Sequence, residues 1–132
     1  MRVILDTNVL VSGVFWRGPA RRILELWMKG SLEVFVSLAL LEEYEEVLNE
    51  IESKRASGLA EGWRMFVAEH ATLVHASKVY KICRDPDDDE VLNCAAAARA
   101  DFVVSGDKDL LVLKRLPDFK IVSPSDFLKR LR

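Results

Sequence analysis

Cysteine and histidine are scarce in this chain of 132 residues, which contains two of each. Cys83 and Cys94 form no Cys-x-x-Cys pair, and neither His70 nor His75 lies in zinc-ligand register with them. A disulfide framework and a zinc site are therefore not indicated. We interpret both cysteines as reduced thiols, with Cys94 packed inside a helix.

Long apolar runs and phosphate-binding glycine loops are also lacking. No stretch approaches the roughly 20 apolar residues of a membrane span, and the N-terminal sequence has the pattern of neither a signal peptide nor a transit peptide. Neither G-x-G-x-x-G nor G-x-x-x-x-G-K occurs, which argues against the common nucleotide-binding loops. The sequence predicts a soluble, cytoplasmic protein that makes no membrane contact.

Basic charge is not in excess either, because the formal net charge is −2 and the pI is about 5.7. Domains that bind nucleic acid through their overall charge are usually basic, so any nucleic-acid contact is expected to be local. The length fits one domain that buries about two-thirds of its unfolded surface. We predict a single domain over residues 1–132.

Short apolar strands alternate with helical patterns along the chain. Continuous and weaker apolar runs predict strands at 2–5, 32–36, 72–74, 102–104 and 121–122. Capping residues, helix breakers and the spacing of apolar residues predict helices at 19–30, 37–51 and 57–70. Three more helices are predicted to begin at the acidic run 85–90, after residue 107 and at residue 124. The alternation predicts an α/β fold, a three-layer α/β/α sandwich around a parallel sheet of about five strands.

Aspartates border the strands at three places. Asp6 ends the first strand, the run 85–90 opens a helix before the fourth strand, and Asp107 and Asp109 follow that strand after Ser105-Gly106. Each group alone is explained by helix capping. In a parallel sheet, however, these positions meet at the carboxyl edge. Oxygen ligands without histidine suit a hard cation, so the sequence predicts metal-assisted chemistry on phosphates.

Two details of the acids follow from helix geometry. Asp87 and Glu90 have the spacing of a capping box, which leaves Asp89 in the first turn, free to point elsewhere. In the helix that Ser37 caps, Glu43 and Glu45 flank the apolar stripe on opposite sides at about 100° per residue. Only these two glutamates are placed where a side chain could extend to the edge of the sheet, periodicity does not choose between them, and a solvated surface position is the default for each.

We predict that Trp16, in the segment Val14-Phe15-Trp16-Arg17-Gly18, lies on a loop. Two roles are open for it, stacking a base or packing against a second subunit. Exposed apolar clusters usually mark interfaces, so the subunit contact is favoured.

Four segments occur in order over nearly the whole chain: Val-Ile-Leu-Asp-Thr-Asn-Val-Leu-Val-Ser, Leu-Leu-Glu-Glu-Tyr-Glu-Glu-Val-Leu, Cys-Arg-Asp-Pro-Asp-Asp-Asp-Glu-Val-Leu and Ala-Asp-Phe-Val-Val-Ser-Gly-Asp-Lys-Asp-Leu. Together they resemble the PIN domain family, and most closely its VapC-like branch of prokaryotic toxins from toxin–antitoxin pairs. Residues 51–81 match no motif of the family.

The resemblance implies a sheet of strand order 3-2-1-4-5 and a ribonuclease site that binds Mg²⁺ or Mn²⁺. It also chooses Glu43 over Glu45. It implies the catalytic residues Asp6, Glu43, Asp89 and Asp107, with Asp6, Asp89 and Asp107 as metal ligands. The supporting positions are Asn8, Ser105, Asp109 and Asp88, the last of which is the nearest alternative to Asp89. The expected partners are an RNA substrate, a cognate antitoxin and a second copy of the chain.

The predicted function is therefore hydrolysis of RNA phosphodiester bonds by a metal-dependent endoribonuclease, the toxin of a toxin–antitoxin pair. Two alternatives stay open. In a non-catalytic module that binds RNA or an antitoxin, the acids only cap helices. In a receiver-like domain, Asp6 accepts a phosphoryl group beside Mg²⁺, which requires a lysine late in the sheet, and Lys108 is the only neighbour.

Overall fold

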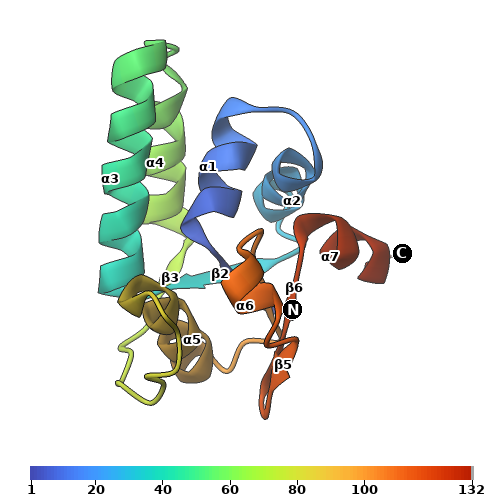
Figure 1. Cartoon of the computed structure of the whole chain (residues 1–132). Coiled ribbons are helices and arrows are strands. Elements are labelled where there is room, and N and C mark those ends of the chain that lie inside the picture. Colours follow the sequence, from blue (N-terminus) through green and yellow to red (C-terminus); the bar gives the residue numbers. More distant parts are fainter. Residues whose placement is uncertain (132) are drawn as a thin grey trace.

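The computed structural model describes residues 1–131, which form a central six-stranded sheet with helices on both faces (Figure 1). The strands are β1 (Arg2–Leu5), β2 (Glu33–Val36), β3 (Thr72–Leu73), β4 (Phe102–Val104), β5 (Arg115–Leu116) and β6 (Phe119–Val122). The helices are α1 (Thr7–Phe15), α2 (Pro19–Met28), α3 (Leu38–Arg55), α4 (Leu59–His70), α5 (Pro86–Ala98), α6 (Lys108–Leu111) and α7 (Pro124–Arg130).

The sheet order is β3-β2-β1-β4-β6-β5, and every neighbouring pair except β5 and β6 is parallel. The predicted α/β class and mainly parallel sheet are confirmed, and the five parallel strands keep the order that the resemblance implied. The sixth strand was not predicted. It is a short antiparallel partner of β6, in which Arg115 pairs with Lys120 and Leu116 with Phe119.

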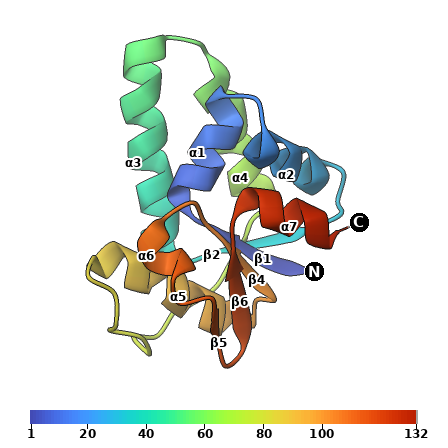
Figure 2. The same ribbon diagram turned by 45° about the vertical axis from the view of Figure 1, so that its right-hand side comes forward.

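Burial of the central strands explains why they read as unbroken apolar runs. The last three residues of β1 and of β2 are buried, as are Val103 and Val104 of β4. Helix α5 covers one face, while α1 and α2 lie on the other (Figure 2). Since both faces are covered, apolar residues are favoured at every position of these strands.

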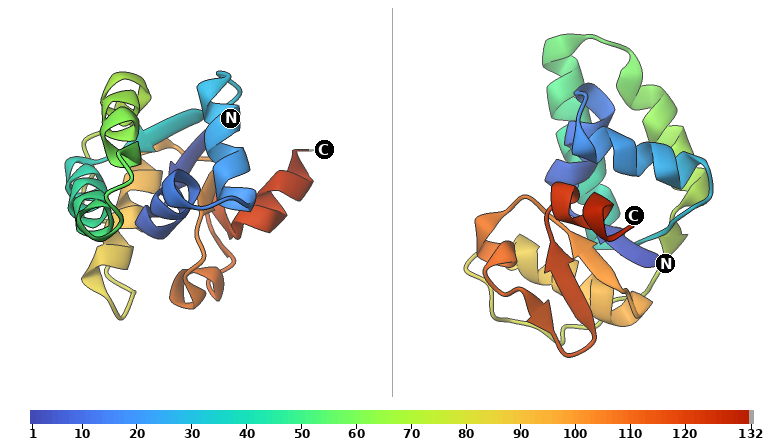
Figure 3. Two further views of the ribbon diagram at one scale, coloured as in Figure 1. Left: turned by 90° about the horizontal axis from the view of Figure 1, so that it is seen from above. Right: turned by 90° about the vertical axis from the view of Figure 1, so that its right-hand side faces the viewer.

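Helix α1 lies between α3 and α2 when the molecule is seen from above (Figure 3). It starts immediately after β1, and α3 starts immediately after β2, where the Ser37 Oγ accepts a hydrogen bond from the Leu40 N–H at 3.2 Å. Both helices therefore begin at the same edge of the sheet. Within residues 1–131, no helix has the length and apolar character needed to span a bilayer.

Gly13 lets α1 approach α2 closely. A Cβ at this position would lie 2.6 Å from Leu24 Cδ1 and 2.9 Å from the Ala20 carbonyl oxygen. We expect Gly13→Ala to lower the free energy of unfolding by about 1–3 kcal/mol, the usual cost of overpacking, in chemical denaturation. Gly62 in α4 is the matched control, because no atom of residues 1–131 lies within 4 Å of its added Cβ. Gly62→Ala should stabilise by about 0.5–1 kcal/mol, and equal effects of the two substitutions would contradict the packing argument.

Candidate metal centre

Asp6 marks the point where β1 ends and α1 begins. Its N–H donates to the Val104 carbonyl at 3.0 Å, which continues the pairing of β1 with β4. Its side chain accepts from the Thr7 N–H at 2.8 Å and from the Ser105 hydroxyl at 2.7 Å. Burial raises the pKa of Asp6, while these hydrogen bonds oppose the rise and the Asp107 charge adds to it. The hydrogen bonds thus fix the Asp6 carboxylate in place, while burial and the Asp107 charge disfavour its ionised form.

Ser105 connects the tip of β1 to the tip of β4. Its fully buried hydroxyl donates to Asp6 and accepts from the Asp107 N–H at 3.0 Å. Asp107 in turn caps α6 by accepting from the Asp109 N–H at 2.8 Å. The chain leaves β1 toward β2 on one side and reaches β4 on the other, so this edge is the topological switch point where open α/β folds place their sites.

Asp88 joins this group from α5. One carboxylate oxygen from each of Asp88, Asp107 and Asp109 lies within 4.8 Å of the others. Asp88 is only 8% exposed. Burial, followed by the charge of Asp107, raises the pKa of Asp88 to about 7. Three aspartates from the N-terminal ends of α5 and α6 therefore converge at one point.

Asp89, which the sequence favoured over Asp88, does not join the cluster. Its Oδ1 accepts hydrogen bonds from the N–H groups of Ile82 at 3.0 Å and Cys83 at 2.9 Å. Although desolvation acts in the opposite sense, these bonds lower the pKa of Asp89. The predicted capping box is also wrong, because the N-cap of α5 is Asp85 and not Asp87. Asp89 is held by the loop that precedes α5 and is not free.

Glu43 reaches the same edge from α3. Burial raises its pKa, and the charges of Asp87, Asp6 and Glu90 add to the rise. Glu45 points elsewhere and pairs with Arg64 at 3.1 Å. The fully buried Tyr44 hydroxyl donates to the Leu5 carbonyl and so fixes this turn of α3 against the end of β1. The structure therefore brings Glu43, and not Glu45, to the acids.

Little positive charge balances these carboxylates. Within residues 1–131, the only ion pair made by an acid of the group joins Asp109 to Arg84 at 3.9 Å, and the Arg84 side chain is 88% exposed. Asn8 is exposed on α1 beside Thr7, and the Thr7 hydroxyl is buried without a hydrogen-bond partner among these residues. A donor set made only of oxygen and short of countercharge fits a hard divalent cation.

The raised pKa of Asp88 predicts a stability that falls with pH. Between its ordinary value of 3.8 and about 7, the folded chain binds more protons at Asp88 than the unfolded chain, so stability is lost as pH rises through this window. In chelator at pH 8, Asp88→Asn should therefore melt about 5 °C above the parent, equivalent to roughly 1–2 kcal/mol after allowance for solvent screening. The difference should vanish near pH 4 in a thermal melt.

Asp89→Asn is the control for this measurement. Its carboxylate is stabilised by backbone N–H groups, so its loss should lower the melting temperature at pH 8. If Asp88→Asn melted below the parent at pH 8, the prediction would be contradicted, because the ionised Asp88 carboxylate would then stabilise the metal-free protein.

The fold and this cluster define a class, an open α/β protein whose carboxylates gather at the switch point of a parallel sheet. The profile of the family described as PIN domain matches residues 2–109. The chain therefore belongs to the PIN domain family, as the resemblance in the sequence implied.

A solved structure shows the same fold at low sequence identity. The crystal structure of VapBC2 from Rickettsia felis, bound to a DNA fragment from their promoter, contains a chain with 18% identity and a TM-score of 0.63. The similarity covers 93% of this chain and 98% of that chain. No curated protein matches.

Proposed function

We propose that this protein is a divalent-metal-dependent endoribonuclease. The observation that carries the proposal is the convergence of Asp6, Asp88 and Asp107 at the switch point, where no Lys or Arg among residues 1–131 forms an ion pair with any of the three. Membership of the PIN domain family supports it, since PIN domains are generally nucleases. An acidic site attracts an anionic substrate only when a cation is bound, which argues for metal dependence.

Asp88, Asp107 and Asp109 supply the closely spaced oxygens that would hold Mg²⁺ or Mn²⁺, with Asp6 beside them. Asp88 replaces Asp89 in this assignment. A bound divalent cation supplies a water of lowered pKa and stabilises charge on the phosphate oxygens. Ser105 holds Asp6 and the start of α6 in fixed relation, so the carboxylates are preorganised for that ion.

Glu43 acts on the proton of the attacking water. Its raised pKa makes it a better proton acceptor than an ordinary surface glutamate. Asn8 is exposed one residue beyond Thr7, where its amide offers the phosphate a donor without adding negative charge. The chain thus provides an ion site, a base and a neutral donor at one edge.

We also propose a biological setting, the toxin of a toxin–antitoxin pair acting in the cytoplasm, with an antitoxin partner and a homodimeric assembly. The support for this setting is the similarity in fold to a chain of the VapBC2 structure. Co-expression with the product of an adjacent small reading frame, followed by purification of a complex, tests the partner directly.

The test of the nuclease is cleavage of single-stranded RNA by the parent protein with Mn²⁺ and with chelator. Asp6→Asn, purified in the same way, controls for contaminating nuclease. Cleavage that requires both Mn²⁺ and Asp6 supports the proposal, and equal cleavage by parent and variant retires it. In parallel, Mn²⁺ should raise the melting temperature of the parent and not that of Asp6→Asn; no difference would favour a non-catalytic binding module.

A further inference from the structure

Helix α1 exposes a single stripe that runs away from the acids. Asn8 and Ser12 are exposed, Trp16 follows directly after the helix, and all other residues of α1 are buried. The spacing of four residues places the three on one face, about 12 Å from first to last. This stripe carries no charge, so it presents no repulsion to a polyanion that leaves the metal centre.

Trp16 forms an aromatic platform at the far end of the stripe. It is 46% exposed, and the edge of Phe15 supports it at 5.9 Å between ring centroids. The guanidinium of Arg55, at the last residue of α3, lies 5.0 Å from the centre of the Trp16 ring. Arg17 and Lys54 are exposed beside these two residues in the chain. Within residues 1–131, no carboxylate pairs with any of these three cations.

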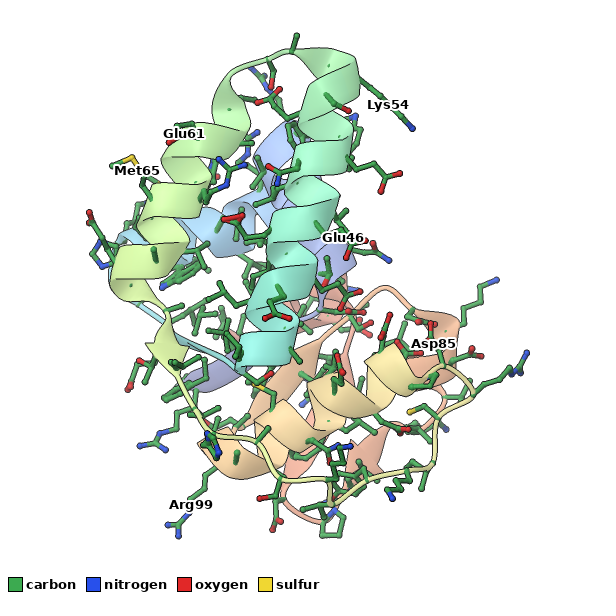
Figure 4. The ribbon with its side chains drawn as sticks, turned by 90° about the vertical axis from the view of Figure 1, so that its left-hand side faces the viewer. Glu46, Lys54, Glu61, Met65, Asp85 and Arg99 are labelled. Atoms are coloured by element: carbon green, nitrogen blue, oxygen red, sulfur yellow. The ribbon has the colours of Figure 1, made fainter. Side chains whose placement is uncertain are left out.

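A line of side chains on α3 connects the same two ends of the molecule, the acids and Trp16. Glu43, Val47, Ile51 and Arg55 recur every fourth residue, with the acid at the metal centre and the cation at Trp16. Val47 and Ile51 pack against the core. Figure 4 shows Lys54 at the end of α3 that lies away from Asp85 and the acidic run. The exposed Glu46 and Glu50 also lie on α3 between these two ends, so the uncharged stripe of α1 is the surface that leads from the acids to the cationic and aromatic end.

We infer that single-stranded RNA lies along this face, with the reacting phosphate at the acids, a base stacked on Trp16 and a phosphate held by Arg55. This inference rests on the proposed ribonuclease function. Aromatic platforms with flanking cations bind single strands because every base offers a π-face and every nucleotide a charge. A packed duplex offers no free base to Trp16, so the face selects unpaired RNA.

The composition around Trp16 favours RNA over the subunit contact that the sequence suggested. Arg17, Lys54 and Arg55 surround a single exposed aromatic, and none of the three has a carboxylate partner within residues 1–131, so this surface carries an unbalanced positive charge that a phosphate backbone complements. A second copy of the chain would also bring its own cations to this surface and repel it. A negatively charged RNA strand is the occupant that complements the cations around Trp16.

The test is binding of a labelled single-stranded RNA of about ten nucleotides to Glu43→Gln protein, which keeps the proposed metal ligands, in Mg²⁺, measured by fluorescence anisotropy. Trp16→Ala should weaken binding about tenfold, and Trp16→Phe, which keeps a stacking face, less than about threefold. Arg55→Gln should reduce the slope of log affinity against log salt by about 0.7, the value for one phosphate on a single strand. In the active protein, Trp16→Ala should raise KM more than it lowers kcat.

Two matched controls lie elsewhere on the molecule. Met65 is an apolar side chain of α4 that is 56% exposed, and Arg130 lies over the Phe102 ring at 5.5 Å. Met65→Ala and Arg130→Gln should leave RNA affinity unchanged, which separates the Trp16 platform from general effects of exposed apolar or cation–π groups.

Unchanged RNA affinity in Trp16→Ala overturns the inference, whether or not the variant changes the oligomeric state in size-exclusion chromatography. If the parent cleaves RNA while Trp16→Ala matches it in KM, only this inference fails and the ribonuclease stands. If the parent neither binds nor cleaves RNA, the proposed function fails with it. Circular dichroism of each variant shows whether a loss of binding reflects unfolding.

Discussion

Asp88→Asn is expected to lower metal-dependent RNA cleavage about a thousandfold. Removing one ligand charge from a divalent ion site costs several kcal/mol of transition-state stabilisation, and each 1.36 kcal/mol is a factor of ten in rate. Asp88 is buried and lies within 4.8 Å of Asp107 and Asp109 through its carboxylate. The measurement is the single-turnover cleavage rate of a labelled RNA in saturating Mn²⁺.

Asp89→Asn is the matched control, one residue further along α5. Its carboxylate holds the loop at Ile82 and Cys83, so we expect its cleavage rate to stay within about tenfold of the parent while its stability falls. The two variants should therefore differ in both measurements. We expect Asp88→Asn to gain stability in chelator at pH 8 and to lose cleavage, and Asp89→Asn to lose stability and to keep cleavage. An active Asp88→Asn protein together with an inactive Asp89→Asn protein would return the ligand role to Asp89.

The sequence contained a signal that separates these two aspartates. Asp88 shares a buried stripe with Val91, Leu92 and Ala95, at the i+3, i+4 and i+7 positions of a helix. Asp89 lies about 100° away from Asp88 around the helix axis. Asking which aspartate of the acidic run lies on the same helix face as the apolar residues that follow would have selected Asp88. The spacing of Asp87 and Glu90 instead suggested a capping box that began at Asp87, and this led to the choice of Asp89.

The partners of Asp89 could not have been found in this way. They are backbone N–H groups in the segment between β3 and α5, which has no regular structure. The same segment is held by Asn93, whose side-chain oxygen accepts from the N–H groups of Val79 at 3.0 Å and Tyr80 at 2.6 Å. Neither periodicity nor turn residues encode such contacts, because they depend on where α5 packs.

The strands were predictable to the extent that they are buried on both faces. β4 is a continuous apolar run, as are β1 and β2 after their exposed first residues, and all three were found at or close to their limits. β5 was missed because Arg115 is exposed and Leu116 only half-buried, so its two residues show no pattern. Its pairing depends on the turn at Pro117-Asp118 and on Phe119, which extends β6 by two residues beyond the predicted start.

Glu43 presents the complementary case, in which the residues left two candidates and the fold brings one of them to the acids. Glu43→Gln is expected to lower the cleavage rate about 10²–10⁴-fold, the usual contribution of a positioned general base. The glutamine keeps the size and polarity of the side chain and loses only the ability to accept a proton. Single-turnover rates in saturating Mn²⁺ measure the loss without a contribution from product release.

The pH profile distinguishes a base from a residue that only shapes the site. Burial and the surrounding acids raise the pKa of Glu43, so the parent should gain activity as pH rises through that value. Saturating Mn²⁺ displaces the proton from Asp88, which leaves Glu43 as the group that the acidic limb reports. Glu43→Gln should flatten this limb, whereas a structural role would lower the rate equally at every pH.

Glu45→Gln is the control on the same helix. Glu45 pairs with Arg64 at 3.1 Å, and its side chain is 44% exposed, so its substitution should cost little stability and leave both the rate and the acidic limb unchanged. Because Glu43 and Glu45 flank the same apolar stripe, any general effect of lost charge on α3 would appear in both variants. A rate loss in Glu45→Gln as large as that in Glu43→Gln would therefore remove the argument that Glu43 is the base.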